Sequence, residues 1–522
     1  MAGTDSTKVT YVTLAGDEAA NASYEVAVKA VAASLGHTQP MWIDGAKAGT
    51  SLDTFEDVSP TDPQVVVARF PRGGPGDVAR ALEGAKRAAR MWAATPWPDR
   101  VALMRRAAEA ISRRRTELAA LMSIEVGKNR LEAMGDAEEA ADLLRYYAQQ
   151  IEDAEGFERP LEKLLPGEDT RSVLRPYGVF AVIAPFNFPL ALAAGMAGGA
   201  LVAGNTVVFK PSSEAPLSGF RLCQIVNDAG LPPGVFQFVT GGGRDLGDAF
   251  LDPRFDGIVF TGSKEVGLDL HRRFARDWPK PVIVEMGGKN PAIVTETADL
   301  QKAAEGVARS AFGFGGQKCS ACSRAFVAAP VYDEFLERLV AVTQALVLGD
   351  PTERATYMGP LITAKARATH RTAHDEARSA GRIVFEGKVP DDPRLARGHF
   401  APPVVVDRLP DGHRIWRDEL FAPLLAVAPT NSLGEAIARA NDTEYGLTAG
   451  IFSEDEGEIR RFFDLIEAGV TYANRRTGAT TGAWPGVQSF CGWKASGSTG
   501  KGGCGPWYVQ QFLREQSRTI VR

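Results

Sequence analysis

The sequence has few cysteines and histidines and no long apolar run. Among its 522 residues are five cysteines and six histidines. A small, odd number of cysteines does not make a disulfide framework, and it favours a reducing, cytoplasmic environment. The longest apolar stretch, residues 189–203, is shorter than the roughly 20 residues of a membrane span and therefore predicts a buried helix. The polar residues 1–10 predict that there is no signal peptide.

An excess of positive charge is also missing. The net charge of −5 argues against a dedicated nucleic-acid binder, so we expect neither a nucleic acid nor a membrane as a partner. A hydrophobic content of 44% and a charged content of 24% are typical of a soluble globular protein. At roughly 100–200 residues per domain, the length predicts about two to four domains.

Periodicity predicts an α/β fold. Residues 24–35, and much of 75–150 with a long helix over 100–126, have helical spacing, whereas 41–45 resembles a strand. Helical segments then alternate with short β-branched runs, which predicts parallel sheets built from βαβ units. The alternation continues over 300–450, with a helix at 299–310 and a strand at 324–328, and indicates a second α/β domain. We expect residues 471–506 to form an ordered functional loop. The predicted strands of the first sheet are 179–184, 206–210, 235–240, 257–261 and 282–285.

A cysteine that follows a glycine-rich run is the first candidate catalytic group. Cys319 comes after Gly313, Gly315 and Gly316, and small residues let a substrate carbonyl approach the backbone closely. The neighbouring Lys318 is expected to lower the pKa of the thiol. The Cys319-x-x-Cys322 spacing also fits a redox pair or half of a zinc site, but no second ligand pair stands at metal spacing, so we expect no metal.

Two further segments offer a base and an oxyanion donor. Glu285 ends an apolar strand, where α/β sheets place catalytic groups, and partial burial should raise its pKa enough for a general base. Asn187 lies in the stiff loop PFNFP at 185–189, and its amide is suited to stabilise an oxyanion. No histidine lies in these segments, which leaves Glu285 as the better base.

A nucleotide site is indicated without the strict G-x-G-x-x-G pattern. The strand over 206–210 ends in Lys210, and the nearby Ser213 and Glu214 are suited to ribose hydroxyls. The segment 262–267 opens a helix whose free N–H groups attract a pyrophosphate. A carboxylate beside the ribose repels a 2′-phosphate, so we expect NAD, with NADP tolerated.

In this order, the motifs resemble those of the aldehyde dehydrogenase superfamily from about residue 40 to the C-terminus. The resemblance implies that Cys319 is the nucleophile of a thioester mechanism, that Asn187 and the Cys319 N–H form the oxyanion hole, and that Glu285 activates water. It also implies NAD(P) binding. The motifs are PFNFP at 185–189, GNTVVFKPSSE at 204–214, FTGSKEVG at 260–267, EMGGKNP at 285–291, FGFGGQKCSACSR at 312–324 and ELFAP at 419–423. The implied cofactor-binding residues are Ile183, Ala184, Pro185, Phe186, Lys210, Ser213, Glu214, Gly243, Gly262, Ser263, Gly267, Glu419 and Phe421.

Within the superfamily, the chain looks most like the 1-pyrroline-5-carboxylate dehydrogenases, which oxidise glutamate γ-semialdehyde to glutamate. The carriers of this resemblance are residues 318–321 and 481–490. They imply a substrate site formed by Phe188, Ser320, Gly482, Ala483 and Phe490. Two residues depart from the usual Q-P-F-G-G motif, because Ser489 replaces proline and Cys491 replaces glycine.

The resemblance also implies a domain plan and an assembly. Residues 1–153 and 176–287 would form a Rossmann-type cofactor domain with an N-terminal arm, and 288–500 a catalytic α/β domain containing a helix at 435–441 and a strand at 469–474. Residues 154–175 and 501–522 would form an oligomerisation flap, which predicts a homodimer or a higher homo-oligomer. The alternatives are a dehydrogenase for another semialdehyde or an aliphatic aldehyde, a non-redox cysteine acyltransferase or hydrolase, and an inactive scaffold.

Overall fold

A seven-stranded sheet forms the base of the N-terminal half in the computed structural model, which describes residues 17–49, 52–389 and 391–522. Five of its strands are parallel, and a short antiparallel hairpin extends one edge. The predicted strands at 206–210, 257–261 and 282–285 are confirmed at their predicted bounds. In spatial order the strands are β11 (Val282–Glu285), β10 (Gly257–Thr261), β7 (Val179–Ile183), β8 (Thr206–Lys210), β9 (Phe236–Phe238), β1 (Met41–Ile43) and β2 (Ala46–Ala48).

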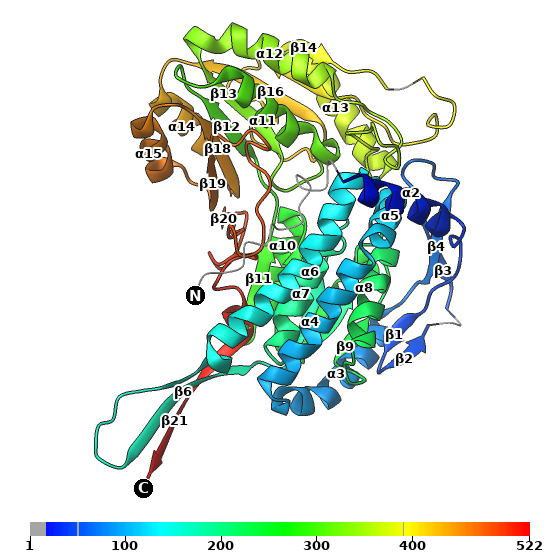
Figure 1. Cartoon of the computed structure of the whole chain (residues 1–522), viewed down its shortest axis with the longest axis vertical. Helices are drawn as coiled ribbons and strands as arrows, with labels where there is room; N and C mark the ends of the chain where they lie inside the picture. The colour runs from blue at the N-terminus through cyan, green and yellow to red at the C-terminus, as the bar shows by residue number, and fades with distance from the viewer. Residues whose placement is uncertain (1–16, 50–51, 390) are drawn as a thin grey trace.

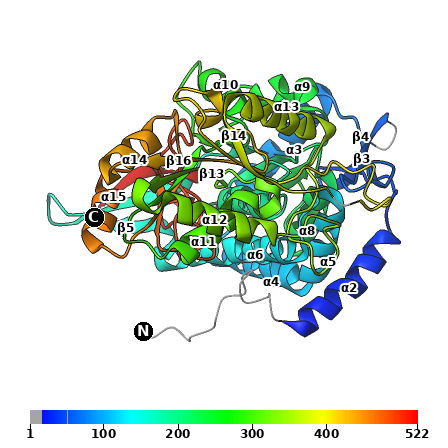
Figure 2. The ribbon, with the colours of Figure 1, turned by 90° about the horizontal axis from the view of Figure 1, so that it is seen from above.

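Helices cover this sheet, and several of them stack side by side (Figure 1). The long helix predicted over 100–126 is wrong in one respect, because the chain leaves helical geometry at Arg114 (φ −99°, ψ 14°) and two helices result. The helices of this half are α2 (Glu18–Ala32), α3 (Pro75–Ala94), α4 (Trp97–Arg113), α5 (Arg115–Val126), α6 (Arg130–Asp153), α7 (Ala191–Val202), α8 (Pro216–Asp228), α9 (Gly243–Leu246) and α10 (Lys264–Phe274). Seen from above, α2 lies along one outer edge (Figure 2), where the Tyr24 hydroxyl donates to Ser123 Oγ of α5 at 2.6 Å.

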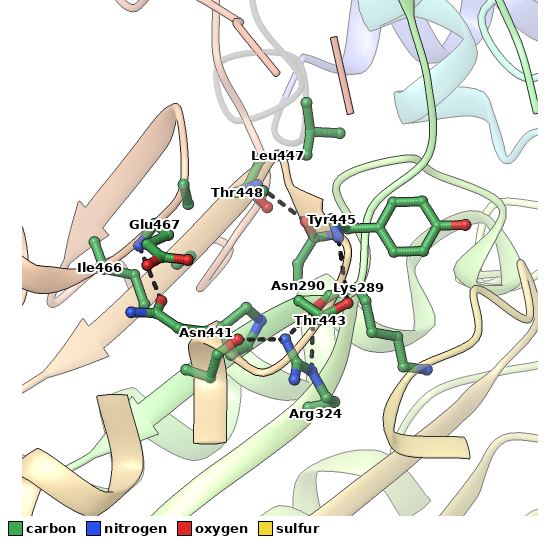
Figure 3. Close-up of a pocket in the computed structure, with 15 residues that line it drawn as sticks. Lys289, Asn290, Arg324, Asn441, Thr443, Tyr445, Leu447, Thr448, Ile466 and Glu467 are labelled. Atoms are coloured by element: carbon green, nitrogen blue, oxygen red, sulfur yellow. Dashed lines mark hydrogen bonds between the residues drawn. The ribbon is translucent and has the colours of Figure 1, made fainter. Parts of the chain in front are cut away.

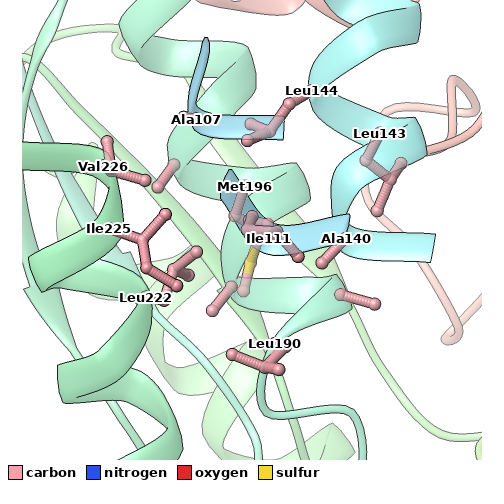
Figure 4. Close-up of a cluster of buried hydrophobic side chains, with 14 of the residues drawn as sticks. Ala107, Ile111, Ala140, Leu143, Leu144, Leu190, Met196, Leu222, Ile225 and Val226 are labelled. Carbon is pink, nitrogen blue, oxygen red and sulfur yellow. The ribbon is translucent and has the colours of Figure 1, made fainter. Parts of the chain in front are cut away.

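Leucine, isoleucine and alanine side chains of α4, α6, α7 and α8 meet in the core of this half (Figure 4). α7 is the buried helix predicted from the apolar stretch 189–203, and small residues let it approach α6 closely. A Cβ atom on Gly198 would lie 2.3 Å from Leu144 Cδ2, so only glycine fits there. This packing fixes the faces of α6 and α7 that line the inner cavity described below.

A second seven-stranded sheet forms the other lobe, as the α/β alternation predicted (Figure 1). All its neighbouring strands are parallel except β14. In spatial order they are β14 (Arg382–Glu386), β15 (Val404–Asp407), β16 (Leu424–Thr430), β13 (Cys322–Ala328), β12 (Asn290–Val294), β18 (Thr448–Phe452) and β19 (Val470–Ala473). The helices are α11 (Leu300–Phe312), α12 (Tyr332–Gln344), α13 (Ala364–Ala380), α14 (Leu433–Asn441) and α15 (Glu456–Leu465).

A three-stranded ribbon projects from the body of the molecule and contains the C-terminal strand (Figure 1). Strand β6 (Glu168–Pro176) pairs along its full length with β21 (Leu513–Val521), and β5 (Glu158–Pro160) lies on its other side. The ribbon and its turn expose apolar side chains, including Leu164 at 88% and Val521 at 72%. Two small antiparallel pairs complete the strands, β3 (Thr54–Val58) with β4 (Val66–Pro71) and β17 (Tyr445–Gly446) with β20 (Trp493–Lys494). Across the described ranges, every helix is too short or too polar to cross a bilayer.

Candidate active site

The candidate nucleophile lies on a tightly folded turn between α11 and β13. The backbone of Phe314, Gly315 and Gly316 has positive φ, and a Cβ atom on Gly316 would lie 2.6 Å from the carbonyl oxygen of Ala422. This close packing holds the turn that leads into Cys319. The cysteine itself is half-buried and free.

A buried amide fixes the backbone of Cys319. Asn290 Nδ2 donates to the carbonyl oxygens of Cys319 at 2.7 Å and Ala321 at 2.9 Å, while its Oδ1 accepts from the Thr448 amide at 3.0 Å. A Cβ atom on Gly288 would lie 2.5 Å from the Cys319 carbonyl oxygen. The glycines of the EMGGKNP motif therefore let strand β12 approach the nucleophile turn.

Glu285 stands at the carboxyl end of β11, directly across from Thr261 of β10. Its carboxyl oxygen Oε2 is buried and has no hydrogen-bond partner among the described residues. Burial raises the pKa of this carboxyl group to about 8, against a smaller opposing effect of the Gly492 amide. The expectation that burial would raise the pKa of Glu285 is confirmed, and the group can take up a proton near neutral pH.

The expectation that Lys318 lowers the pKa of the thiol is wrong. The Lys318 ammonium pairs with Glu132 at 2.7 Å, so its charge is already neutralised. Burial, together with the Glu419 and Glu285 carboxylates, raises the pKa of Cys319 to about 12. The resting thiol is therefore protonated, and it needs a base when it attacks.

An inner cavity of about 100 Å³ joins the two groups. Cys319 and Glu285 both line it, and so do all five predicted substrate-site residues, Phe188, Ser320, Gly482, Ala483 and Phe490. Glycine is required at position 482, where φ is +100° and a Cβ atom would lie 2.4 Å from Arg475 Nη2. The other lining residues are Glu139, Leu143, Tyr147, Ala191, Leu192, Gly195, Met196, Thr261, Met286, Gly503, Cys504 and Tyr508.

Sequence reasoning missed the α6 wall of this cavity. Glu139, Leu143 and Tyr147 recur every four residues and therefore share one helix face. Burial raises the pKa of the Glu139 carboxyl to about 8, with further contributions from Asp136 and other nearby charges. The sequence signal that could have revealed this wall is a glutamate that interrupts the apolar stripe of a helix.

Asn187 is buried beside the nucleophile turn. Its Nδ2 donates to the Gln317 carbonyl oxygen at 3.1 Å, and within the described residues the second N–H of the amide has no acceptor. The next side chain, Phe188, lies beneath the Lys128 ammonium at 3.5 Å from the ring centroid, and Lys128 pairs with Asp136 at 2.6 Å. Asp136 in turn accepts from the Ala191 amide at 2.7 Å, so one buried ion pair fixes the C-terminal side of the Asn187 loop.

The predicted ribose-binding residues lie at the end of β8. Lys210 is buried, its Nζ donates to the Pro211 carbonyl oxygen at 3.0 Å, and burial lowers its pKa to about 8. Ser213 Oγ donates to the Gly241 carbonyl oxygen at 3.2 Å. Glu214 is exposed, and Gly243 begins α9 with open space where a Cβ atom would stand.

The predicted pyrophosphate-binding segment caps α10. Ser263 is the N-cap residue, and its Oγ accepts from the Val266 amide at 3.4 Å. Gly262 and Gly267 pack tightly, because Cβ atoms there would lie 2.4 Å from Phe260 and 2.5 Å from Met286. Helix N-termini have N–H groups without intrahelical partners, and those of α10 that Ser263 does not cap can bind an anion.

The remaining predicted cofactor residues come from both lobes. Residues 183–186 continue from the end of β7, and the Phe186 ring contacts the Phe421 ring edge-on at 6.0 Å between centroids. Glu419 Oε1 accepts from the Gly288 amide at 2.9 Å, and burial raises its pKa to about 7. A Cβ atom on Gly287 would lie 1.9 Å from Glu419 Oε2, so this glycine is needed for the carboxylate to approach.

Behind the EMGGKNP motif lies a small pocket of about 10 Å³ (Figure 3). Arg324 donates to the carbonyl oxygens of Lys289 at 3.0 Å and Ala440 at 2.8 Å there. The buried Lys289 ammonium has no hydrogen-bond partner among the described residues, and burial lowers its pKa to about 7. The pocket is too small for a substrate, and its polar contacts hold the motif in place.

The two departures from the Q-P-F-G-G motif lie in the loop that closes the cavity. Cys491 is 8% exposed, and burial and the Glu285 carboxylate raise its pKa to about 11. The amide of the next residue, Gly492, lies within hydrogen-bond reach of Glu285. The cysteine side chain is therefore accommodated near the base, and Phe490 still lines the cavity.

Comparison with known proteins adds to this geometry. The profile of the aldehyde dehydrogenase family matches residues 47–517. The 1-pyrroline-5-carboxylate dehydrogenase of Geobacillus kaustophilus (strain HTA426) is 37% identical over 510 residues, which cover 96% of each chain.

Two solved structures show the same fold. One is a 1-pyrroline-5-carboxylate dehydrogenase from Thermus with bound NAD, which has a TM-score of 0.93 and 35% identity over the whole of both chains. The other is a betaine aldehyde dehydrogenase from Staphylococcus aureus in complex with NAD⁺, with a TM-score of 0.88 and 27% identity over 96% of this chain and 97% of that one. The fold is thus common to enzymes with different aldehyde substrates.

Proposed function

The chain belongs to the aldehyde dehydrogenase family, and from that premise we propose that it oxidises L-glutamate γ-semialdehyde to L-glutamate with NAD. One observation carries the proposal: Cys319, Glu285 and a second carboxyl group, Glu139, face the same small cavity beside the Gly482–Ala483 turn. The first two groups supply thioester chemistry. Glu139 and the Gly482–Ala483 turn are matched to a substrate that carries both an ammonium and a carboxylate.

The substrate's polar end defines the specificity. Free backbone amides in a turn form a concave site for an anion, and the Gly482–Ala483 turn with Ser320 offers such a site to the α-carboxylate. Glu139 lies on the α6 wall and would pair with the α-ammonium as a charge-assisted contact. Phe188 and Phe490 would cover the aliphatic stem. A simple aliphatic aldehyde uses none of these polar groups.

The residues at the cofactor site fit NAD. Lys210 keeps a buried ammonium with a single carbonyl partner, and the N-terminus of α10 has glycines at positions where a Cβ atom would clash. We assign Lys210, Ser213 and Glu214 to the adenine-side ribose and Glu419 to the nicotinamide ribose. Residues 183–186 and Phe421 would flank the cofactor, and Gly243, Gly262, Ser263 and Gly267 would lie by the pyrophosphate. When bound, NAD supplies the acceptor for the hydride of the aldehyde carbon.

The chain's own groups move the protons. As the Cys319 sulfur bonds to the aldehyde carbon, the thiol proton passes to the Glu285 carboxylate, which lines the same cavity. The resulting oxyanion accepts hydrogen bonds from Asn187 Nδ2 and the Cys319 amide. After oxidation leaves a thioester on Cys319, Glu285 releases the thiol proton to solvent and takes a proton from water as hydroxide adds to the acyl carbon. Glu285 then returns this proton to the departing Cys319 sulfur, which regenerates the thiol, and the acid product leaves and ionises to the carboxylate.

We also propose the domain division predicted above, with a cytoplasmic location and a homo-oligomeric assembly through the flap. Support comes from the projecting β5–β6–β21 ribbon, whose exposed side chains at Leu164 and Val521 would be covered by a second copy. Deletion of residues 513–522 should shift the mass measured by light scattering toward the monomer. An unchanged mass would contradict the assignment of the flap.

NADH formation on a panel of aldehydes tests the enzyme assignment. Glutamate γ-semialdehyde should give a higher kcat/KM than succinate semialdehyde, and propanal the lowest. Cys319→Ala should abolish NADH formation, whereas Cys223→Ala, which removes a buried thiol of α8 that does not line the cavity, should retain it. Aldehyde turnover without NADH would instead favour a non-redox cysteine enzyme.

A further inference from the structure

An outer pocket of about 360 Å³ adjoins the inner cavity. The two spaces share Phe188, Ser320 and Gly482 as walls, so the outer pocket lies directly against the cavity that contains Cys319. The outer pocket is lined by the start of α6, the end of α11 and the loop over 475–482. Its volume is larger than that of the inner cavity, and its lining side chains carry a different charge.

Among the described residues, five cationic side chains and one carboxylate, Glu132, line the outer pocket. Three of the cations already have carboxylate partners. Lys318 pairs with Glu132 at 2.7 Å, Arg130 pairs with Glu25 at 3.2 Å, and Arg354 pairs with Glu18. The other two, Arg309 and Arg475, have no ion pair with any residue in the part of the chain that the structure describes.

Arg475 is held in place without a counter-ion. Its Nη2 donates to the Gly482 carbonyl oxygen at 2.8 Å, and its guanidinium lies over the Tyr472 ring at 5.0 Å from the centroid. Its Nε atom is buried and has no partner in the described ranges. A guanidinium that is fixed by a ring and a carbonyl keeps its remaining donors oriented for a ligand.

Two contacts bring Arg309 beside this loop. The Ala479 amide donates to the Gly306 carbonyl oxygen at 2.9 Å, and the Thr480 amide donates to Ser310 Oγ at 3.1 Å. The C-terminal turn of α11, which carries Arg309, is therefore fastened to the 475–482 loop. Because both arginines line one pocket from these two elements, their charges act on the same space.

We propose that Arg309 and Arg475 form a docking site for carboxylates, at which an anionic aldehyde is captured before it enters the inner cavity. A carboxylate is the favoured ligand because guanidinium groups bind it through paired N–H donors. The proposal rests on the proposed function and adds a second, outer contact for the substrate. Two positive charges in one pocket also attract an anion over distance, which raises the rate of capture.

The decisive variant is Arg309→Gln, because the Arg309 side chain does not line the inner cavity. We expect kcat/KM for glutamate γ-semialdehyde and succinate semialdehyde to fall about 10-fold at low salt, within the range of electrostatic steering. Values of kcat should stay within about two-fold, and propanal should be unaffected. Added salt should shrink the difference between variant and wild type, because it screens the charges.

The matched control is Arg476→Gln. Arg476 directly follows Arg475 in the chain. It is 64% exposed and pairs with Glu305 outside the pocket, so its loss should change no kinetic constant. Arg475→Lys separates charge from positioning. A docking role predicts that lysine retains most of the preference for anionic aldehydes, whereas a purely structural role predicts a loss of kcat on every aldehyde.

Two outcomes would overturn the docking site. One is an Arg309→Gln enzyme with unchanged kcat/KM on both carboxylated aldehydes, and the other is an equal loss on propanal. The proposed function is judged separately, by the wild-type preference for glutamate γ-semialdehyde over succinate semialdehyde. If that preference is absent, succinate semialdehyde against propanal still tests the docking site.

Discussion

Glu285 should make the protein less stable as the pH rises, and Glu285→Gln should remove that effect. Burial raises the pKa of this carboxyl to about 8, whereas in the unfolded chain it is near its usual 4.5. A folded-state pKa above the unfolded one means that the native state holds the proton more tightly. The stability that this provides is complete below about pH 4.5 and is lost progressively up to about pH 8.

The size of the effect follows from the two pKa values. At about 1.4 kcal/mol per pH unit, ionisation between pH 4.5 and pH 7 costs the native state about 3 kcal/mol, and water in the cavity reduces this toward about 1 kcal/mol. Neutral glutamine has nearly the same shape and avoids the cost. If the whole chain unfolds as one unit, its unfolding entropy is about 1 kcal/mol per kelvin, so the variant should melt about 1–3 °C higher at pH 7.

Thermal melting of both proteins between pH 5 and pH 9, at one scan rate, provides the assay. The difference in Tm should be small at pH 5, grow up to about pH 8 and then level off, while the variant loses both thioester formation and turnover. A wild-type protein that melts higher than Glu285→Gln at pH 8, or a difference that does not depend on pH, would refute the assignment of Glu285 as a buried, desolvated base.

Three other predictions follow from the same geometry. The turnover number of the wild type, if limited by thioester hydrolysis, should rise with pH and level off above about pH 8, because only the ionised Glu285 accepts a proton from water; a flat profile would exclude this role. Glu139→Gln should lower kcat/KM for glutamate γ-semialdehyde about 10–100-fold but leave succinate semialdehyde nearly unchanged, because only the first carries an ammonium; equal losses would contradict the pairing. Gly287→Ala should displace Glu419, whose Oε2 would lie 1.9 Å from the new Cβ atom, and thereby raise KM for NAD about 10-fold. An unchanged KM in NAD titrations would show that Glu419 is not needed for NAD binding.

Local sequence was sufficient for the elements whose signals are local. The strands at 206–210, 257–261 and 282–285 are short β-branched runs next to glycine, proline or polar residues, and the structure has them at the predicted bounds. The break at Arg114 had no such signal, because neither glycine nor proline stands there. It follows from how α4 and α5 pack on other elements, which no local pattern contains.

The candidate site divides in the same way. Residue type and position indicated Cys319 and Glu285, and burial raised the pKa of Glu285 as expected. The expectation for Lys318 was wrong because its partner, Glu132, lies 186 residues away in the sequence. Glu139 was missed for a related reason. A glutamate in a helix is usually solvated, and only the packing of α6 on α7 directs this side chain toward the cavity.

The charges around the nucleophile explain why a carboxyl base is needed at all. The cations nearest to the nucleophile turn are held elsewhere, Lys318 by Glu132 and Arg324 by backbone carbonyls, while the neutral amide of Asn290 fixes the Cys319 carbonyl. Because burial and two nearby carboxylates raise the pKa of Cys319, the thiol keeps its proton until the aldehyde arrives. Attack and deprotonation must then be coupled through Glu285. The same desolvation that suppresses the thiolate is what raises the pKa of Glu285 into the range where it can accept the proton and later release it.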